Sequence, residues 1–248
     1  MNIVRIVAVA GVLAAAATIV PVAPAGATPA PASWPAVYLV PHQDDETLLM
    51  GASILRQVEA RRPVWVFLAT DGSATSACPQ VGLDPASCTV ERDREFRAAA
   101  HALGVPDSRV RIVTRPNGGR YRDGTLTYAD ARMIVASAAN TVRRANGGSP
   151  AMSLKAPSWT DSHGDHAALG AALRDARAAD ARFMLKDFSP TLAPVPPGAR
   201  VARDQPANGA PLYAARDAYR SGYGVGYLSV RAAFDYVVTH PWRRAHTR

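Results

Sequence analysis

Two histidine motifs carry the residue types with which this chain could do chemistry. The segment PHQDDE (41–46) directly follows the apolar run AVYLV (36–40), and SHGDH (162–166) follows the run AMSLKA (151–156) after a short loop. Carboxylates held beside a low-dielectric core cost several kcal/mol unless a cation or a proton compensates them. We therefore expect a bound cation at the end of the first run.

The spacing within the motifs separates the roles of their side chains. His42 and Asp45 are three residues apart and share a face if the chain turns into a helix there, so both can bind one metal ion. Asp44 points off that face, so it can stand beside a metal-bound water, and it would be the general base. His163 and His166 have the same spacing, so one can complete the metal shell while the other faces substrate. Two histidines and one carboxylate are typical of catalytic zinc, which lowers the pKa of water to about 7.

Either motif alone is weak evidence of a site. A single histidine or aspartate at the end of a strand is usually a helix cap or a turn residue. Two such motifs at one edge of a predicted sheet favour a shared site.

The rest of the chain alternates short apolar runs with amphipathic segments. The predicted strands are 36–40, 63–70, 109–114 and 151–156, and the predicted helices are 47–60, 90–103, 128–145 and 166–179. This alternation predicts an α/β fold with a mostly parallel sheet and helices on both faces, whose ligands bind beyond the carboxyl ends of the strands. We expect 189–211, rich in Pro, Ala and Gly, to be loop, 227–238 to be a strand or a helix, and 239–248 to be a frayed basic tail.

The chain resembles the PIG-L/LmbE-like family of zinc-dependent N-deacetylases. The motifs that carry the resemblance are PHQDDE, LATDG (68–72), RDREFRAAAHALG (92–104) and SHGDHAALGAAL (162–173). The resemblance implies a Rossmann-like three-layer sandwich. Two positions depart from the family pattern, since Gln43 and Gly164 stand where proline is commoner, and we expect both changes to loosen their loops.

The resemblance also implies roles for individual residues. It makes His42, Asp45 and His166 the zinc ligands and Asp44 the general base. It further assigns His163 to stabilising the tetrahedral intermediate, Asp165 to orienting a histidine, and Arg92 to the neighbourhood of the substrate.

Residues 1–27 have the pattern of a cleavable secretory signal peptide. A single charged residue, Arg5, precedes the apolar stretch 6–20, and the small residues Ala25, Gly26 and Ala27 follow. The stretch is shorter than the roughly 20 residues that span a bilayer, although an uncleaved anchor is the alternative. We expect a secreted protein, with no stable membrane insertion after cleavage and with residues 28–248 as one deacetylase domain.

Cysteine content and charge bound the remaining function classes. Cys78 and Cys88 are the only two cysteines, and in an exported chain we expect them to form a disulfide; a pair of metal-binding thiolates would lack the usual CxxC spacing. The net charge is +8, and cleavage of the signal would remove one positive charge. The arginines are scattered, so the charge fits a soluble basic protein better than one that binds acidic wall polymers, and we expect no nucleic-acid partner.

These observations predict a secreted zinc hydrolase that removes an acetyl or other acyl group from an N-acylated amino sugar, oligosaccharide or glycoconjugate. Another divalent metal is an alternative to zinc. Two further functions stay open: a non-catalytic extracellular carbohydrate-binding protein, and a metal-dependent amidase with a non-sugar substrate. Asp44 disfavours the pure binder, which has no need of a general base.

Overall fold

A four-stranded parallel sheet lies at the centre of the computed structural model, which describes residues 34–149, 151–180, 187–189, 200–240 and 243–247. Its strands are β1 (Ala36–Val40), β2 (Val64–Leu68), β3 (Val110–Ile112) and β4 (Ser153–Lys155), in the order β3-β2-β1-β4. Tyr38 of β1 aligns with Val66 of β2 and with Lys155 of β4, and every pairing is parallel. The predicted α/β fold with a mostly parallel sheet is confirmed.

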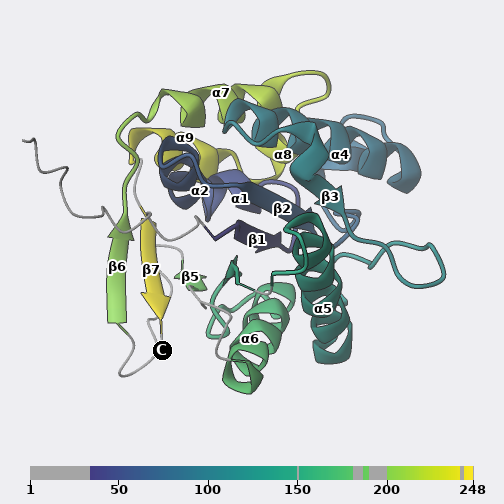
Figure 1. The fold of residues 1–248 in the computed structure, drawn as a ribbon. Helices are drawn as coiled ribbons and strands as arrows, with labels where there is room; N and C mark the ends of the chain where they lie inside the picture. The colour runs from purple at the N-terminus through teal and green to yellow at the C-terminus, as the bar shows by residue number, and fades with distance from the viewer. Residues whose placement is uncertain (1–33, 150, 181–186, 190–199, 241–242, 248) are drawn as a thin grey trace, which may run out of the picture. The chain divides into compact units, whose positions relative to one another are not determined.

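Helices cover both faces of this sheet, because successive side chains of a strand point to opposite faces. Tyr38 and Val66 pack in one apolar cluster, on the side of α2 (Gly51–Glu59), α4 (Pro85–Ala102), α7 (Ala210–Arg220) and α9 (Arg231–Thr239). Val37 and Trp65 pack in the other, on the side of α5 (Tyr128–Ala145) and α6 (Gly164–Ala179). Figure 1 shows α5 and α6 on one side of the sheet and the other four helices opposite them. The result is three layers.

Helix boundaries differ from the prediction where local capping decides them. The predicted helix 47–60 is two helices, α1 (Asp45–Leu48) and α2, separated at residues 49–50. The helix predicted from 90 begins at Pro85, because the Asp84 carboxylate accepts the amides of Ala86 and Ser87 and proline is well suited to the first helical position. α5 has the predicted bounds and begins with a capping box between Thr127 and Asp130.

The C-terminal region contains more regular structure than the sequence pattern indicated. The expected loop 189–211 contains β6 (Arg200–Asp204) and the start of α7, whereas 190–199 lie outside the described residues. The expected frayed tail contains β7 (Arg243–Thr247), which pairs antiparallel with β5 (Asp187–Ser189) and β6. The segment 227–238 is helical, in α8 (Val225–Ser229) and α9. The expectations of a loop at 189–211 and of a frayed tail at 239–248 were therefore wrong for the described parts of both segments.

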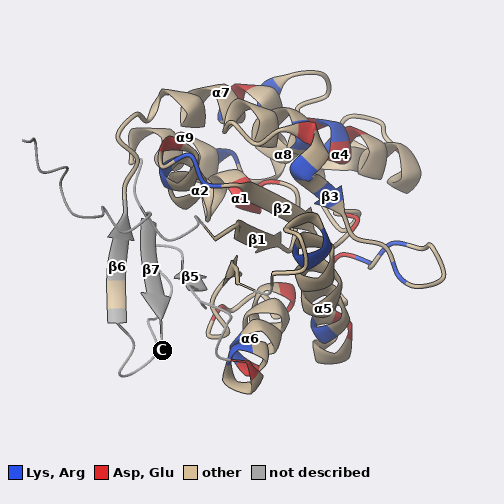
Figure 2. Ribbon diagram, viewed as in Figure 1, with Lys and Arg blue, Asp and Glu red and all other residues tan. Residues whose placement is uncertain are grey.

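The predicted signal peptide, 1–27, lies outside the described residues, all of which belong to the unit Ser33–Arg248. Within the described part of the chain, no helix combines the length and the apolar character that crossing a bilayer requires. Figure 2 shows the described Lys and Arg residues spread over several helices and loops rather than gathered in one stripe.

Candidate active site

The two histidine motifs meet at the carboxyl ends of β1 and β4, as parallel strands in adjacent positions require. They line an open cavity of about 450 Å³. From the motifs come His42, Asp44, Asp45, His163 and His166, and from elsewhere Arg92, Asp123 and a rim of small residues. Most of the charged side chains are buried, while His163 is exposed.

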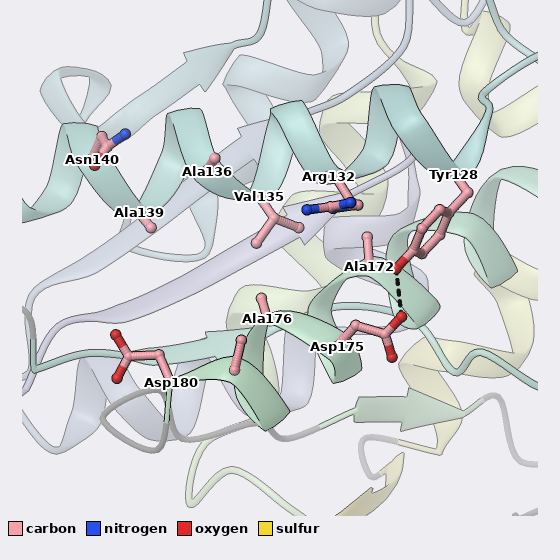
Figure 3. Close-up of a pocket in the computed structure, with 11 residues that line it drawn as sticks. Tyr128, Arg132, Val135, Ala136, Ala139, Asn140, Ala172, Asp175, Ala176 and Asp180 are labelled. Carbon is pink, nitrogen blue, oxygen red and sulfur yellow. Dashed lines mark hydrogen bonds between the residues drawn. The ribbon is translucent and has the colours of Figure 1, made fainter.

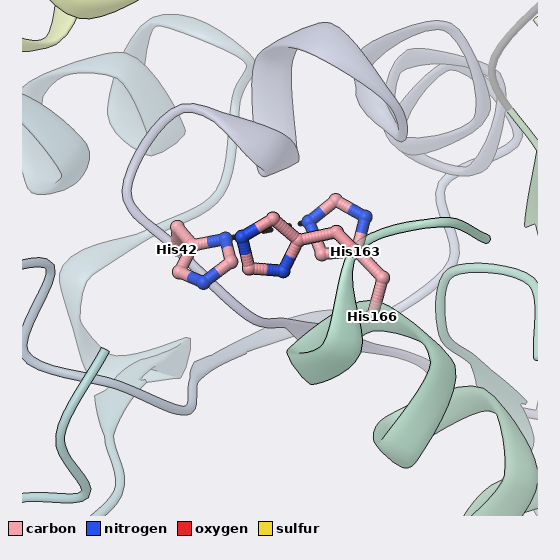
Figure 4. Close-up of side chains that lie close together, drawn as sticks. All are labelled: His42, His163 and His166. Carbon is pink, nitrogen blue, oxygen red and sulfur yellow. Dashed lines mark hydrogen bonds between the residues drawn. The ribbon is translucent and has the colours of Figure 1, made fainter. Parts of the chain in front are cut away.

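Three atoms from the two motifs converge on one point. His42 Nδ1 and His166 Nε2 each lie 3.2 Å from Asp45 Oδ2, and the two nitrogens are 3.3 Å apart. Two ligands that each lie 2.0–2.1 Å from a tetrahedral ion are roughly 3.3–3.4 Å from each other. Figure 4 shows the rings of His42, His163 and His166 gathered together, the last two from the start of α6. The spacing of the three atoms fits a single metal ion.

Carboxylates behind the two rings fix which nitrogens face that point. His42 Nε2 lies 3.0 Å from Asp165 Oδ2 and 3.1 Å from Asp123 Oδ1, and His166 Nδ1 lies 3.2 Å from Asp161 Oδ2. An ionised carboxylate can only accept, so the outer nitrogens carry the ring protons. In neutral rings the inner nitrogens then present lone pairs to the Asp45 oxygen. Three electron-rich atoms at this spacing require a cation, either extra protons or a metal.

The pKa values of the cluster reflect the same requirement. Burial alone would lower the pKa of His166, but the Asp45 and Asp161 carboxylates outweigh it and raise the pKa to about 9. Burial likewise opposes the hydrogen bonds from Asp123, Asp165 and Asp45, which raise the pKa of His42 well above its usual value. Protons and a metal ion therefore compete for the inner nitrogens of these rings.

Asp44 lies beside this point but makes different contacts. Its Oδ2 accepts a hydrogen bond of 3.0 Å from Arg92, and none of the described residues donates to its Oδ1. Burial raises the pKa of Asp44 to about 7, against the lowering effect of Arg92. The two adjacent aspartates thus point in different directions, as the spacing predicted, and Asp44 has the pKa of a base that works near neutral pH.

Arg92, predicted to lie near the substrate, lines the cavity and is 3 % exposed. It donates to the carbonyl oxygens of Gly72 and Gln43 at 2.7 and 2.5 Å as well as to Asp44. Gly72 has a φ of +64°, and a Cβ there would lie 1.9 Å from Gln43 Oε1, so only glycine fits this approach. Arg92 therefore ties the segment after β2 to the first motif.

Gln43 is buried rather than loose. Its amide nitrogen donates to Asp93 Oδ1 at 2.8 Å and to the Asp71 carbonyl at 3.2 Å. The expected loosening of the first motif is therefore not what the structure shows. At Gly164, the first residue of α6, an added Cβ would meet no atom within 4 Å.

His163 caps α6 and has a defined tautomer. Its Nδ1 accepts a hydrogen bond of 3.3 Å from the Asp165 amide, so in the neutral ring Nε2 carries the proton and is a donor. Burial and the neighbouring His42 and His166 lower the pKa of His163, which favours that neutral form. The side chain can donate a hydrogen bond to charge that develops in the cavity.

The rim of the cavity joins segments from distant parts of the chain. Thr75 Oγ1 lies 2.6 Å from Ser229 Oγ, which links the segment after β2 to the end of α8. Cys78 and Cys88 form a disulfide, and both belong to one apolar cluster with Val225 of α8. The disulfide therefore lies in the apolar cluster between the segment after β2 and α8, both of which contribute residues to the rim.

Asp123 and Asp161 are site residues that sequence reasoning missed. Both are single carboxylates in loops, and neither has a motif spacing to its histidine partner. The only available signal for Asp161 was its place next to SHGDH, and Asp123 carries none.

A second hollow, of about 540 Å³, lies between α5 and α6 (Figure 3). Alanine side chains form much of its lining, and at one end the Tyr128 hydroxyl donates to Asp175. No histidine or cysteine lines it. The histidine cluster lines the smaller cavity instead.

Comparison with known proteins identifies the family. Residues 37–177 match the model of the PIG-L family, described as GlcNAc-PI de-N-acetylase. The chain belongs to the PIG-L family. The matched segment contains both histidine motifs, Arg92, Asp123 and Asp161, while α7, α8 and α9 lie beyond it.

One curated relative with a stated activity is a deacetylase. A 1D-myo-inositol 2-acetamido-2-deoxy-alpha-D-glucopyranoside deacetylase of Kineococcus radiotolerans is 34% identical over 96 residues, which are 38% of this chain and 26% of that protein. The chain thus matches about a quarter of that relative's length.

Solved structures show the same fold. The A40926 pseudoaglycone deacetylase has 19% identity and a TM-score of 0.59, with 87% of this chain and 96% of that chain covered. The N,N'-diacetylchitobiose deacetylase of Pyrococcus horikoshii has 17% identity and a TM-score of 0.58, with 82% and 76% covered. The zinc-inhibited form of teicoplanin deacetylase Orf2 has 18% identity and a TM-score of 0.56, with 86% and 98% covered.

Proposed function

We propose that this protein is a metal-dependent N-deacetylase that hydrolyses the acetamide of an N-acetylated amino sugar or of a glycoconjugate that carries one. The observation that carries the proposal is the convergence of His42 Nδ1, Asp45 Oδ2 and His166 Nε2 within 3.3 Å of one another, beside Asp44. Membership of the PIG-L family supports the reaction, and the acetylated sugars named for one curated relative and one structural neighbour support the substrate class.

The donor set fits zinc, and other divalent ions share these ligands. Two imidazole nitrogens and one carboxylate oxygen, with room for a fourth ligand, are typical of catalytic zinc sites. A metal held by His42, Asp45 and His166 would supply Lewis acidity to the amide carbonyl and to water.

The surrounding side chains supply the proton transfers. Asp44 takes a proton from the attacking water and then gives it to the departing amine, while Arg92 keeps its carboxylate in place through Oδ2. His163, a donor at Nε2, stabilises the negative charge that develops on the carbonyl oxygen. The cavity is open to solvent, so a sugar attached to a larger molecule can reach these groups.

The predicted signal peptide supports an extracellular location for this activity. We propose that the substrate is an extracellular glycan, a chitooligosaccharide, a wall fragment or a glycosylated natural product. A metal-dependent amidase with a non-sugar substrate is the second candidate, since the same residues could cleave another amide.

Mass spectrometry of acetylated compounds after incubation with the purified protein tests this function. The set should include N-acetylglucosamine, N,N'-diacetylchitobiose, longer chitooligosaccharides and simple N-acetyl amino acids, each with and without added zinc. Loss of an acetyl group from the sugars alone supports the proposal. Turnover of the amino acids alone would favour the amidase, and binding of sugars without turnover would favour a carbohydrate-binding protein.

A further inference from the structure

The backbone of Asp44 has a conformation that side chains rarely adopt. Its φ is 125° and its ψ is −33°, and among the described non-glycine residues only Arg61 also has a positive φ. Such a conformation persists only where the surrounding structure imposes it, and it often marks a functional site. Some contact must hold Asp44 in this state.

The buried side chain of Glu46 makes that contact with the backbone of Asp44. The Asp44 amide donates to Glu46 Oε2 at 3.2 Å, while the Asp44 carbonyl accepts the amides of Thr47 and Leu48 at 2.9 and 2.8 Å. Glu46 is fully buried, so its carboxylate has little freedom to turn away. The amide and the carbonyl of the strained residue are thereby both fixed.

Tyr219 fixes Glu46 in turn. The Tyr219 hydroxyl donates to Glu46 Oε1 at 2.8 Å, and Thr47 Oγ1 donates to the same oxygen at 2.6 Å. Tyr219 is fully buried and lies in α7, outside the segment 37–177 that matches the family. A hydroxyl from the C-terminal part of the chain therefore reaches the back of the first histidine motif.

We infer that Glu46 and Tyr219 are positioning residues that hold Asp44 at positive φ and so aim its carboxylate into the cavity. If φ returned to the usual negative range, the Cα–Cβ bond would swing and carry Oδ2 away from Arg92. A displacement of about 1 Å of a catalytic group can cost roughly 10²-fold in rate. The inference rests on the proposed function, because it takes Asp44 to be the general base.

Crystal structures of variants test the positioning without any turnover. Glu46→Leu removes the acceptor at similar volume, and we expect Asp44 to leave positive φ in that variant. Glu46→Gln keeps a carbonyl oxygen for the Asp44 amide, so we expect it to keep the wild-type backbone. Asp44 unchanged at positive φ in both Glu46→Leu and Tyr219→Phe would overturn the inference.

Kinetics supply the second test, with Tyr219→Phe as the mild variant. We expect its kcat to fall by about tenfold, with KM and metal content unchanged, because the base is misplaced and the binding groups are not. Tyr38→Phe is the matched control: it removes another buried hydroxyl of the same apolar cluster, one bonded to Ser53 and Lys155, and we expect kcat to be kept.

A double-mutant comparison separates positioning from general damage. In an Asp44→Asn background, Tyr219→Phe should cause no further loss of rate, because it acts through Asp44. An equal loss in both backgrounds would overturn the inference while leaving the proposed function intact. If Asp44→Asn itself leaves the activity unchanged, the proposed function fails instead.

Discussion

Asp44 and Asp45 are adjacent in the chain but face different partners. Asp45 Oδ2 lies 3.2 Å from both His42 and His166, whereas Asp44 Oδ2 contacts Arg92. Burial of Asp45 is outweighed by these histidines, which hold its pKa well below the usual range, while burial raises the pKa of Asp44 to about 7. One carboxylate is suited to bind a cation and the other to move a proton.

The two Asp→Asn variants should therefore fail in different ways. Asp44→Asn should keep the metal and lose roughly 10²- to 10⁴-fold in kcat, because the general base is gone. Asp45→Asn should lose affinity for the metal. Metal content and turnover should be measured on the same preparations. Loss of metal from Asp44→Asn together with full activity of Asp45→Asn would contradict the assignment.

Asp161 should matter for the metal although it does not contact it. Its carboxylate holds His166 through Nδ1 at 3.2 Å, so Asp161→Asn should reduce metal affinity by about 10- to 100-fold. Competition with a chromogenic chelator measures this affinity. Asp175→Asn, an acid in the second half of α6 at the distant hollow, is the control, and equal affinities in the two variants would refute the role of Asp161.

The residues of the histidine motifs could be predicted from the sequence, whereas the residues that contact the motifs from distant parts of the chain could not. A three-residue spacing places His42 beside Asp45 whatever the fold, because it is a local property of a turn. Asp123 lies 81 residues after His42 in the sequence, and the chain forms β2 and β3 before it returns to this histidine. No local pattern therefore marks Asp123. The positive φ of Asp44 is likewise imposed by Tyr219, 175 positions later in the sequence.

At the scale of elements, α8 is held against the site by a buried acid. Glu95 of α4 is fully buried, and its two carboxylate oxygens accept the amides of Val225 and Gly226 at 2.8 Å each. Burial raises the pKa of Glu95 to about 7 from 4.5, against the lowering effect of these two bonds. The ionised form of Glu95 therefore carries a cost in the folded protein.

This cost predicts how stability depends on pH. Because the pKa of Glu95 is higher in the folded state, protonated Glu95 favours the folded protein. This contribution is fully present below pH 4.5 and is lost as the pH rises to about 7. Relative to Glu95→Gln, the wild-type free energy of unfolding should fall by at most about 1.4 kcal/mol per pH unit within this window. Urea titrations at several pH values measure this difference.

Glu91→Gln is the control for that measurement. The hydrogen bond from Arg94 lowers the pKa of Glu91, so its titration affects stability only at more acid pH. Between pH 5 and 7 we expect the free energy of unfolding of this variant to change with pH as that of the wild type does. In this range Glu91 is ionised in both the folded and the unfolded state, since an ordinary glutamate has a pKa of about 4.3. Parallel curves for wild type and Glu95→Gln across that window would show that Glu95 does not titrate as described.

The helices and strands that could be predicted well from the sequence are those whose sequence signals lie within the element itself. The strands β1 and β2 are continuous apolar runs, and α5 has both an amphipathic period and a capping box. The start of α4 at Pro85 also has a local signal, an aspartate directly followed by proline. β6 and β7 were missed because their pattern, RVARD and RRAHT, has few apolar residues and depends on pairing with each other.

At the scale of the whole molecule, export is the main expectation still to be tested. The mature protein should begin close to residue 28, after the small residues Ala25, Gly26 and Ala27. N-terminal sequencing of protein recovered from the culture medium checks this. Protein that stays with the membrane fraction and keeps residues 1–27 would instead support an uncleaved anchor.

The metal content of His166→Ala provides the most direct test of the proposed site. Purified wild-type protein should carry about one zinc or similar divalent ion per chain, and removal of one of three ligands should abolish most of that binding. His101→Ala, an exposed histidine of α4, is the matched control and should keep the wild-type content. Elemental analysis and acetate release should be measured on the same samples. We expect His166→Ala to lose both metal and activity; full metal occupancy in that variant would contradict the proposed metal site.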